Sequence, residues 1–169
     1  MTLGTFSLML LETDPVGSSV NDFATIVAPS EDPYQSVGDT LVPVRDDQWR
    51  GIVIEAATDS VQTLTGNYHF LLDVGEDGKP VITRTALWQN QDQLTGNGPA
   101  RSIRVCVRGE YLSANPSVET FRLLVGLMHR LQQIASISAE RVYLPGDYDV
   151  RAPHFSEDFA TAFHRNLAR

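Results

Sequence analysis

Lysine and cysteine are nearly absent from this 169-residue chain, and each shortage excludes a class of structure or function. Lys79 is the only lysine among 13 basic residues, which face 21 acidic ones and leave a formal net charge of −8. Binding nucleic acid by phosphate neutralisation requires clustered positive charge, so the composition argues against a nucleic-acid partner. Cys106 is the only cysteine, which excludes an intrachain disulfide framework.

Long apolar runs are also missing. No segment approaches the roughly 18 consecutive apolar residues that a membrane-spanning helix requires. The apolar patch at residues 6–11 is short, has no basic residue before it and is followed by acidic residues, unlike a signal peptide. We therefore expect no membrane span and a cytoplasmic location, or a place in an exported assembly.

The remaining composition is that of a globular protein. With 42% hydrophobic and 20% charged residues, the chain is long enough for one domain with its own core. Residues 6–12 predict a strand, and residues 13–40 predict an irregular segment interrupted by proline and glycine. We therefore divide the chain into an N-terminal strand and arm at 1–48 and an α/β domain at 49–169.

Hydrophobic periodicity predicts the elements of this domain. Strands are expected at 51–56, 68–74, 80–85, 102–108 and 141–144, with 80–85 as the hairpin partner of 68–74. A long helix is expected over 116–135 behind the N-cap Asn115, and a final helix is expected behind the N-cap Ser156. This order predicts an α/β fold with a mixed central sheet, a long packed helix and a C-terminal helix. The strands at 102–108 and 141–144 should run parallel.

Three segments, in order, carry a resemblance to a known family. They are "IVIEAATDS", then "NYHFLLD", then "SIRVCVRGEYLSANPSVETF" followed by "SAERVYLPGDYDVRAPHF". Over roughly residues 49–168 they resemble the zinc-dependent N-acetylmuramoyl-L-alanine amidases and the peptidoglycan recognition proteins, whose motifs read "IVIHHSAT", "YHF", "SIGICLVGDF", "PPERVLGHRD" and "CPGPHF". The resemblance implies an amidase-like α/β fold. The family's helix before "YHF" is expected to be a loop here, over residues 57–67.

The zinc ligands of that family are not kept. The family binds zinc through the first histidine of "IVIHH", the histidine of "GHRD" and a cysteine or histidine of the "CPG" segment. The matching positions are Glu55, a position at or next to Pro145, and a position near Val150 or Arg151. A catalytic zinc needs three protein donors and an open position. The resemblance therefore implies a degenerate member, for which we expect no zinc cofactor and no metal site.

The candidate site residues follow from the same comparison. Tyr68 matches the family's catalytic tyrosine and is a candidate binding residue, together with Arg104, Arg108 and His154. Glu55, at the lost ligand position, is expected to pair with Arg104 or Arg108. A buried carboxylate without a partner is unfavourable, and an arginine can bind it through two hydrogen bonds.

Three functions remain open. The first is a catalytically degenerate amidase-like module that binds a peptidoglycan fragment or a protein partner. The second is an active N-acetylmuramoyl-L-alanine amidase or related hydrolase, with a metal site rebuilt from Glu55, His154 and either Asp147 or Asp149. The third is an architectural subunit of a larger assembly. The irregular segment at 13–40 favours a protein partner, because such a segment can lie across a neighbouring subunit.

Overall fold

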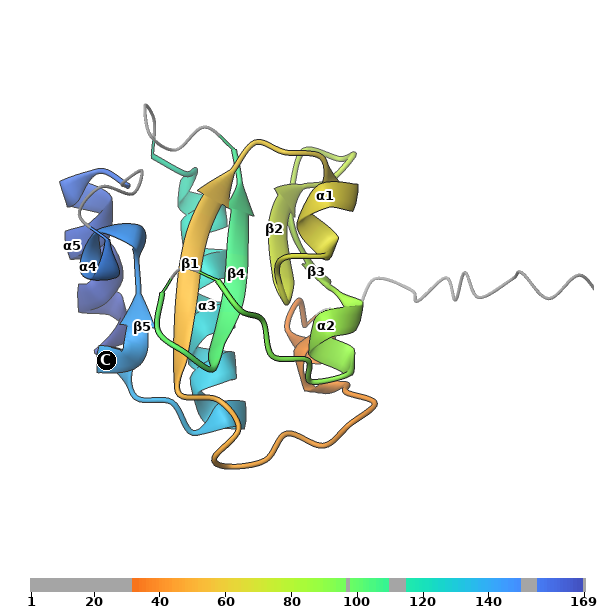
Figure 1. The fold of residues 1–169 in the computed structure, drawn as a ribbon. Helices are drawn as coiled ribbons and strands as arrows, with labels where there is room; N and C mark the ends of the chain where they lie inside the picture. The colour runs from red at the N-terminus through yellow and green to blue at the C-terminus, as the bar shows by residue number, and fades with distance from the viewer. Residues whose placement is uncertain (1–31, 97, 110–114, 150–154, 169) are drawn as a thin grey trace, which may run out of the picture.

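A five-stranded mixed sheet forms the centre of the protein (Figure 1). The computed structural model describes residues 32–96, 98–109, 115–149 and 155–168. The strand order is β3-β2-β4-β1-β5, where β2 pairs parallel with β4, β4 with β1 and β1 with β5, and β3 is antiparallel to β2. The strands are β1 (Gly51–Ala57), β2 (Phe70–Val74), β3 (Pro80–Arg84), β4 (Ser102–Arg108) and β5 (Val142–Tyr143). The expected mixed α/β sheet, its hairpin and its parallel strands are confirmed.

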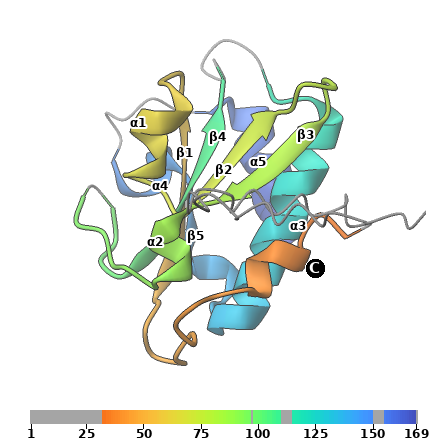
Figure 2. The same ribbon diagram turned by 90° about the vertical axis from the view of Figure 1, so that its right-hand side faces the viewer.

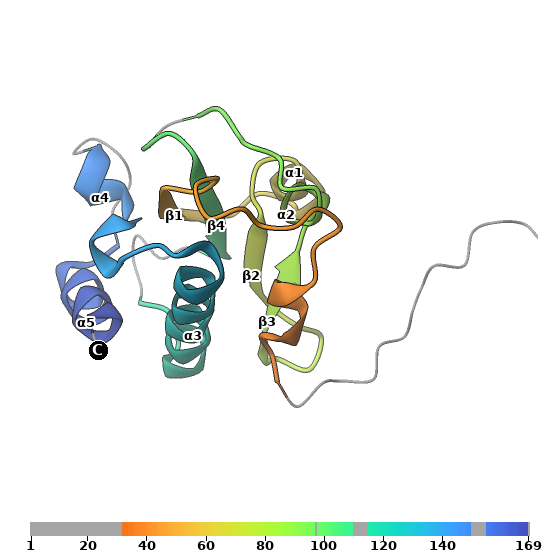
Figure 3. The ribbon, with the colours of Figure 1, turned by 90° about the horizontal axis from the view of Figure 1, so that it is seen from below.

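Helices lie on both faces of this sheet. They are η1 (Gln35–Gly38), α1 (Val61–Thr65), α2 (Ala86–Gln89), α3 (Val118–Ala135), η2 (Ala139–Arg141), α4 (Pro145–Tyr148) and α5 (Glu157–Leu167). The long helices α3 and α5 cover one face, and the short helices α1, α2 and α4 lie on the other side (Figures 2 and 3). Among the described residues, short helices and loops cover the second face, which leaves room for polar side chains.

The main core fills the space between the sheet and α3 and α5. Strand alternation sends Ile52 and Ile54 of β1 and Ile103 and Val105 of β4 to this face, where none is exposed. Helix α3 adds an apolar stripe at helical spacing: Leu123, Leu124, Leu127, Met128, Leu131 and Ala135. Burying one such side chain contributes about 1.5–3 kcal/mol, so this stripe anchors the helix to the sheet.

The start of α3 differs from the expectation. Ser117, rather than Asn115, is the N-cap, because its hydroxyl accepts the Thr120 N–H at 3.1 Å. Asn115 instead accepts a hydrogen bond from the Ser156 hydroxyl at 2.5 Å. Ser156 is the N-cap of α5, as expected, and accepts the Phe159 N–H at 3.2 Å.

The expectation of a loop over 57–67 was wrong, since this stretch contains α1. The Ser60 hydroxyl caps that helix by accepting the Thr63 N–H at 3.4 Å. Leu64 is 2% exposed and packs against Leu71 and Cys106, on the sheet face opposite α3. One buried leucine and a serine cap are thus enough to hold a single helical turn between polar neighbours.

The strand expected at residues 6–12 lies outside the described residues. The described part of the arm, residues 32–48, is joined to the domain core. Val37 is fully buried, and its carbonyl accepts the Trp88 indole N–H at 2.9 Å. No helix within the described ranges is long and apolar enough to cross a membrane.

Candidate functional site

An ion pair stands on the sheet face opposite α3. Along β1, Glu55 points away from the main core because Ile54 and Ala56 point into it. In the parallel register Arg104 lies opposite Val53, two residues before Cys106, which is the residue opposite Glu55. The long arginine side chain spans this offset of two residues, and its Nη2 atom lies 2.5 Å from Glu55 Oε2. The expected pairing of Glu55 with an arginine is confirmed, with Arg104 as the partner.

Solvent screens this pair only weakly. Both side chains are 17% exposed. Burial acts to lower the pKa of Arg104, but the hydrogen bond and the charge of Glu55 outweigh it, so the pKa ends above its usual value. Arg104 therefore stays protonated and bound to Glu55 across the neutral pH range.

Two tyrosines complete the cluster around Glu55. Tyr148, from α4, donates its hydroxyl to Glu55 Oε1 at 3.2 Å. The ring of Tyr68 stacks against the guanidinium of Arg104, 5.2 Å from Cζ to the ring centroid. Burial, and then the negative charge of Glu55, raises the pKa of both phenols. Both tyrosines therefore stay neutral donors rather than becoming bases or nucleophiles at neutral pH.

His69 fixes the backbone beneath the ion pair. Its ring is fully buried against Trp49, and its Nδ1 accepts the backbone N–H of Arg104 at 2.8 Å. Nε2 must then carry the proton, which it donates to the Asp92 carbonyl at 2.9 Å. Burial lowers the pKa of this histidine. It is a neutral structural group that sets the position of Arg104.

Arg108, the other candidate partner of Glu55, is engaged elsewhere. It lies four residues beyond Arg104 along β4, on the same face, and forms an ion pair with Asp73 of β2. The side chains of Arg108 and Asp73 are 37% and 22% exposed, so this second pair is more accessible than the first. Of the two expected alternatives, Arg104 is the partner of Glu55, and Arg108 bridges β4 to β2 instead.

The donor set at the implied zinc position does not fit a zinc ion. The Glu55 carboxylate is bound by a cationic guanidinium, which a metal would have to displace. Pro145 begins α4, is buried and has no side-chain donor. Val150 and Arg151 lie outside the described residues. Within the described ranges, no three or more histidine, cysteine, aspartate or glutamate side chains gather to hold a metal.

The residues expected for a rebuilt metal site, His154 and Asp147 or Asp149, do not gather around Glu55 among the described residues. His154 lies outside the described residues. Asp147 accepts the backbone N–H of Leu144 at 2.6 Å and pairs with His164 at 3.4 Å, so it stabilises α4 and its contact with α5. Sequence reasoning missed Tyr148, which lies between the two aspartates that it did consider. The only available signal was an aromatic residue beside the matched "GHRD" position.

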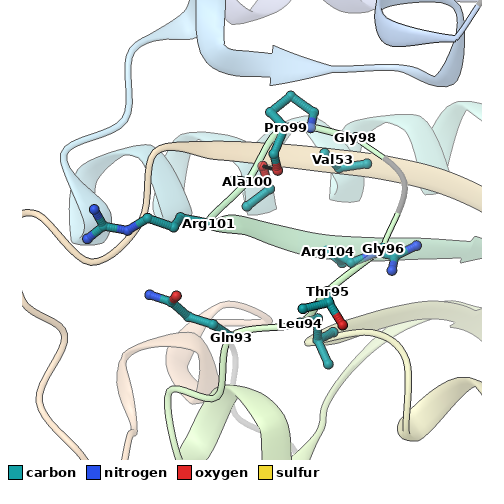
Figure 4. A pocket seen from close by; sticks show the side chains of 11 residues that line it. Val53, Gln93, Leu94, Thr95, Gly96, Gly98, Pro99, Ala100, Arg101 and Arg104 are labelled. Atoms are coloured by element: carbon teal, nitrogen blue, oxygen red, sulfur yellow. Dashed lines mark hydrogen bonds between the residues drawn. The ribbon is translucent and has the colours of Figure 1, made fainter.

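The loop before β4, described at residues 93–96 and 98–101, crosses the cluster of Glu55, Arg104, Tyr68 and Tyr148 and forms a cavity beside it. The cavity has a volume of about 320 Å³ and lies between the loop and strands β1 and β4 (Figure 4). Gly96 lies directly over Arg104, where a Cβ atom would come within 2.5 Å of Nη1. At Gly98, which has a φ of 101°, a Cβ atom would meet the side chains of Val53 and Tyr148. Larger side chains at these two positions would lift the loop away from the ion pair.

The strand order and the two helical layers define an α/β protein with an amidase-like fold. A mutant structure of PlyL matches with a TM-score of 0.53 at 14% identity, over 71% of this chain and 85% of that chain. The PlyG catalytic domain matches at 0.46, with 12% identity over 81% and 91% of the two chains. PGRP-Hd from Alvinella pompejana matches at 0.42, with 18% identity over 82% and 96%. No protein-family model and no curated protein matches the chain.

Proposed function

We propose that this protein is a non-hydrolytic binding module built on the amidase-like fold. Its partner is a peptidoglycan fragment or another protein, and it acts by recognition rather than by cleaving an amide bond. The observation that supports this proposal is the Glu55–Arg104 pair, which stands where the resemblance locates the first zinc ligand.

The chemistry of that pair explains why it opposes metal-assisted hydrolysis. A zinc hydrolase uses the metal to acidify a bound water and to polarise the scissile carbonyl. Arg104 supplies positive charge at the same place, but a guanidinium has no open coordination position and does not ionise water. The raised pKa values of Tyr68 and Tyr148 leave neither phenol ionised as a replacement base.

Metal analysis and a hydrolysis assay on one preparation test the proposal. The purified full chain is equilibrated with excess zinc, freed of unbound metal and analysed for zinc content. It is then incubated with N-acetylmuramoyl-L-alanyl peptides while newly released amino groups are measured. We expect zinc far below one ion per chain and no release of amino groups above the buffer background.

The opposite result is equally specific. Stoichiometric zinc, lost together with hydrolysis in Glu55→Ala, would establish an active hydrolase with a rebuilt metal site. Asp77→Ala is a suitable control, because its carboxylate is 60% exposed and lies in the turn between β2 and β3. It should leave both measurements unchanged in either case.

A further inference from the structure

An apolar pocket lies between the first turns of α3 and α5, on the sheet face opposite the Glu55–Arg104 pair (Figure 3). Its volume is about 210 Å³, and apolar side chains of Val118, Phe121 and Phe159 line it. Pockets for small molecules begin at about 300 Å³, whereas an apolar cavity of about 150 Å³ holds one benzene ring. The pocket therefore has room for a single large apolar side chain.

The walls of the pocket are held in place before anything binds. Phe159 is 4% exposed, meets Phe121 edge to face with ring centroids 5.6 Å apart, and stacks on Phe163 at 5.7 Å. The Ser156 hydroxyl donates to the Asn115 side chain at 2.5 Å, which joins the start of α5 to the segment before α3. An incoming side chain would thus meet fixed walls, and little entropy would be lost in ordering them.

One lip of the pocket is an exposed apolar side chain. Val118 begins α3 and is 65% exposed. A single exposed valine is ordinary on a protein surface, but this one borders a cavity whose other walls, Pro116, Phe121 and Ala162, also carry apolar side chains. A partner that covered Val118 while filling the cavity would remove contiguous apolar surface from water, which favours association.

The charge around the pocket is negative. Asp158 is the only ionisable side chain in the described lining, and within the described part of the chain it forms no ion pair. The first two turns of the two helices carry Glu119, Glu157 and Asp158 against one arginine, Arg122. This charge disfavours an anionic lipid and a second copy of the chain, whose net charge is −8. It favours a cationic group beside the pocket.

We propose that this pocket is the docking site for a protein partner, which inserts one aliphatic or aromatic side chain and places a lysine or arginine beside Asp158. A central apolar anchor with charges at its rim is the usual arrangement of a protein interface. The proposal rests on the binding role proposed above, and it names a basic, apolar protein segment as the partner.

Three capped five-residue peptides test this chemistry. The first has phenylalanine at its centre and arginine at the other four positions. The second replaces the phenylalanine with serine, and the third replaces the arginines with glutamate. The isotope-labelled full chain is titrated with each at low ionic strength, and the backbone amide resonances are followed by NMR. We expect saturable shifts at residues 117–121 and 158–162 with the first peptide, binding at least roughly tenfold weaker with the second, and no saturable shift with the third.

Four variants locate the site. Ala162→Leu fills the pocket, and Val118→Ser removes the apolar lip at an exposed position where the fold is not at risk, so each should weaken binding of the first peptide. Asp158→Asn should weaken it by about threefold, as expected for an exposed ion pair. Asp77→Asn is the matched control, because it removes the same charge in the turn between β2 and β3 and should bind like the unmodified protein.

Equal affinity for the phenylalanine and serine peptides overturns the proposal, as does unchanged binding in both Ala162→Leu and Val118→Ser. It also fails if Asp158→Asn binds as tightly as Asp77→Asn. Shifts at the pocket residues that follow protein concentration without any peptide would assign the pocket to a second copy of the chain and overturn the basic partner.

These outcomes are separable from failure of the proposed function. A protein that lacks zinc and hydrolysis but does not take up the phenylalanine peptide refutes this partner chemistry alone. Zinc-dependent hydrolysis refutes the binding-module proposal itself, whatever the pocket binds, because the pocket and the Glu55–Arg104 pair lie on opposite faces of the sheet.

Discussion

Replacing Glu55 and Arg104, one at a time and together, measures how strongly the two side chains interact in the folded protein. Glu55→Gln keeps the shape of the side chain and removes its charge. Arg104→Met keeps an apolar stem and removes the guanidinium. The double variant removes both charges, so the cycle separates their mutual interaction from the other contacts that each side chain makes.

The geometry sets the expected size of the effect. With Nη2 and Oε2 2.5 Å apart, the charge centres lie about 4 Å apart, where the attraction is about 4 kcal/mol at an effective dielectric constant of about 20. Removing one partner from a buried pair leaves an uncompensated charge and typically costs about 3–5 kcal/mol. We expect each single variant to lose about 3 kcal/mol of unfolding free energy, and the double variant to lose little more. The coupling energy is then about 2–3 kcal/mol.

Urea unfolding followed by circular dichroism gives the four free energies. The exposed pair of Lys79 and Asp77, with Nζ and Oδ2 3.6 Å apart and side chains 79% and 60% exposed, provides a matched control cycle. Its coupling should stay below about 1 kcal/mol, because solvent screens exposed pairs. A coupling for Glu55 and Arg104 no larger than that of this control would refute the argument that burial makes the pair strong.

Three further outcomes are expected. Leu124→Ala should lower the free energy of unfolding by about 2–5 kcal/mol, because Leu124 is fully buried, whereas Val118→Ala, at a position 65% exposed, should change it by less than about 0.5 kcal/mol. The pKa of His69 is lowered in the folded state, so the stability that neutral His69 contributes is present above its unfolded pKa of about 6.5 and is lost as the pH falls. In thermal melts, the melting temperature of His69→Gln should therefore fall less with acid than that of the unmodified protein. Gly98→Ala should lose about 1–2 kcal/mol because its φ is 101°. Gly66→Ala, where φ is −83° and a Cβ atom would make only an ordinary contact with the Thr63 carbonyl at 4.0 Å, should lose less, and equal losses in denaturant melts would contradict this reasoning.

Local patterns in the sequence determined most of the elements and the absence of the family's zinc ligands. The alternation over β4 and the apolar stripe of α3 are properties of neighbouring residues, because side-chain direction repeats every two residues in a strand and every 3.6 in a helix. The residue types at positions 55 and 145 also exclude the family's ligands without any structure. The short helix α1 was missed, since five residues held by one buried leucine carry too little periodicity to read.

Only the tertiary structure decided which groups meet. Arg104 and Arg108 lie on the same face of the same strand, so the sequence could not choose between them as partners for Glu55. The register of β1 and β4 places Arg104 and Arg108 at equal offsets, opposite Val53 and Ala57, on either side of Glu55. Arg108 is taken by Asp73 of β2, and Arg104 is therefore the partner of Glu55. Tyr148 reaches Glu55 across 93 positions of sequence, through the packing of α4 against β1. The cavity depends likewise on loop closure over two strands, because pairings between distant residues follow from register and packing rather than from local sequence.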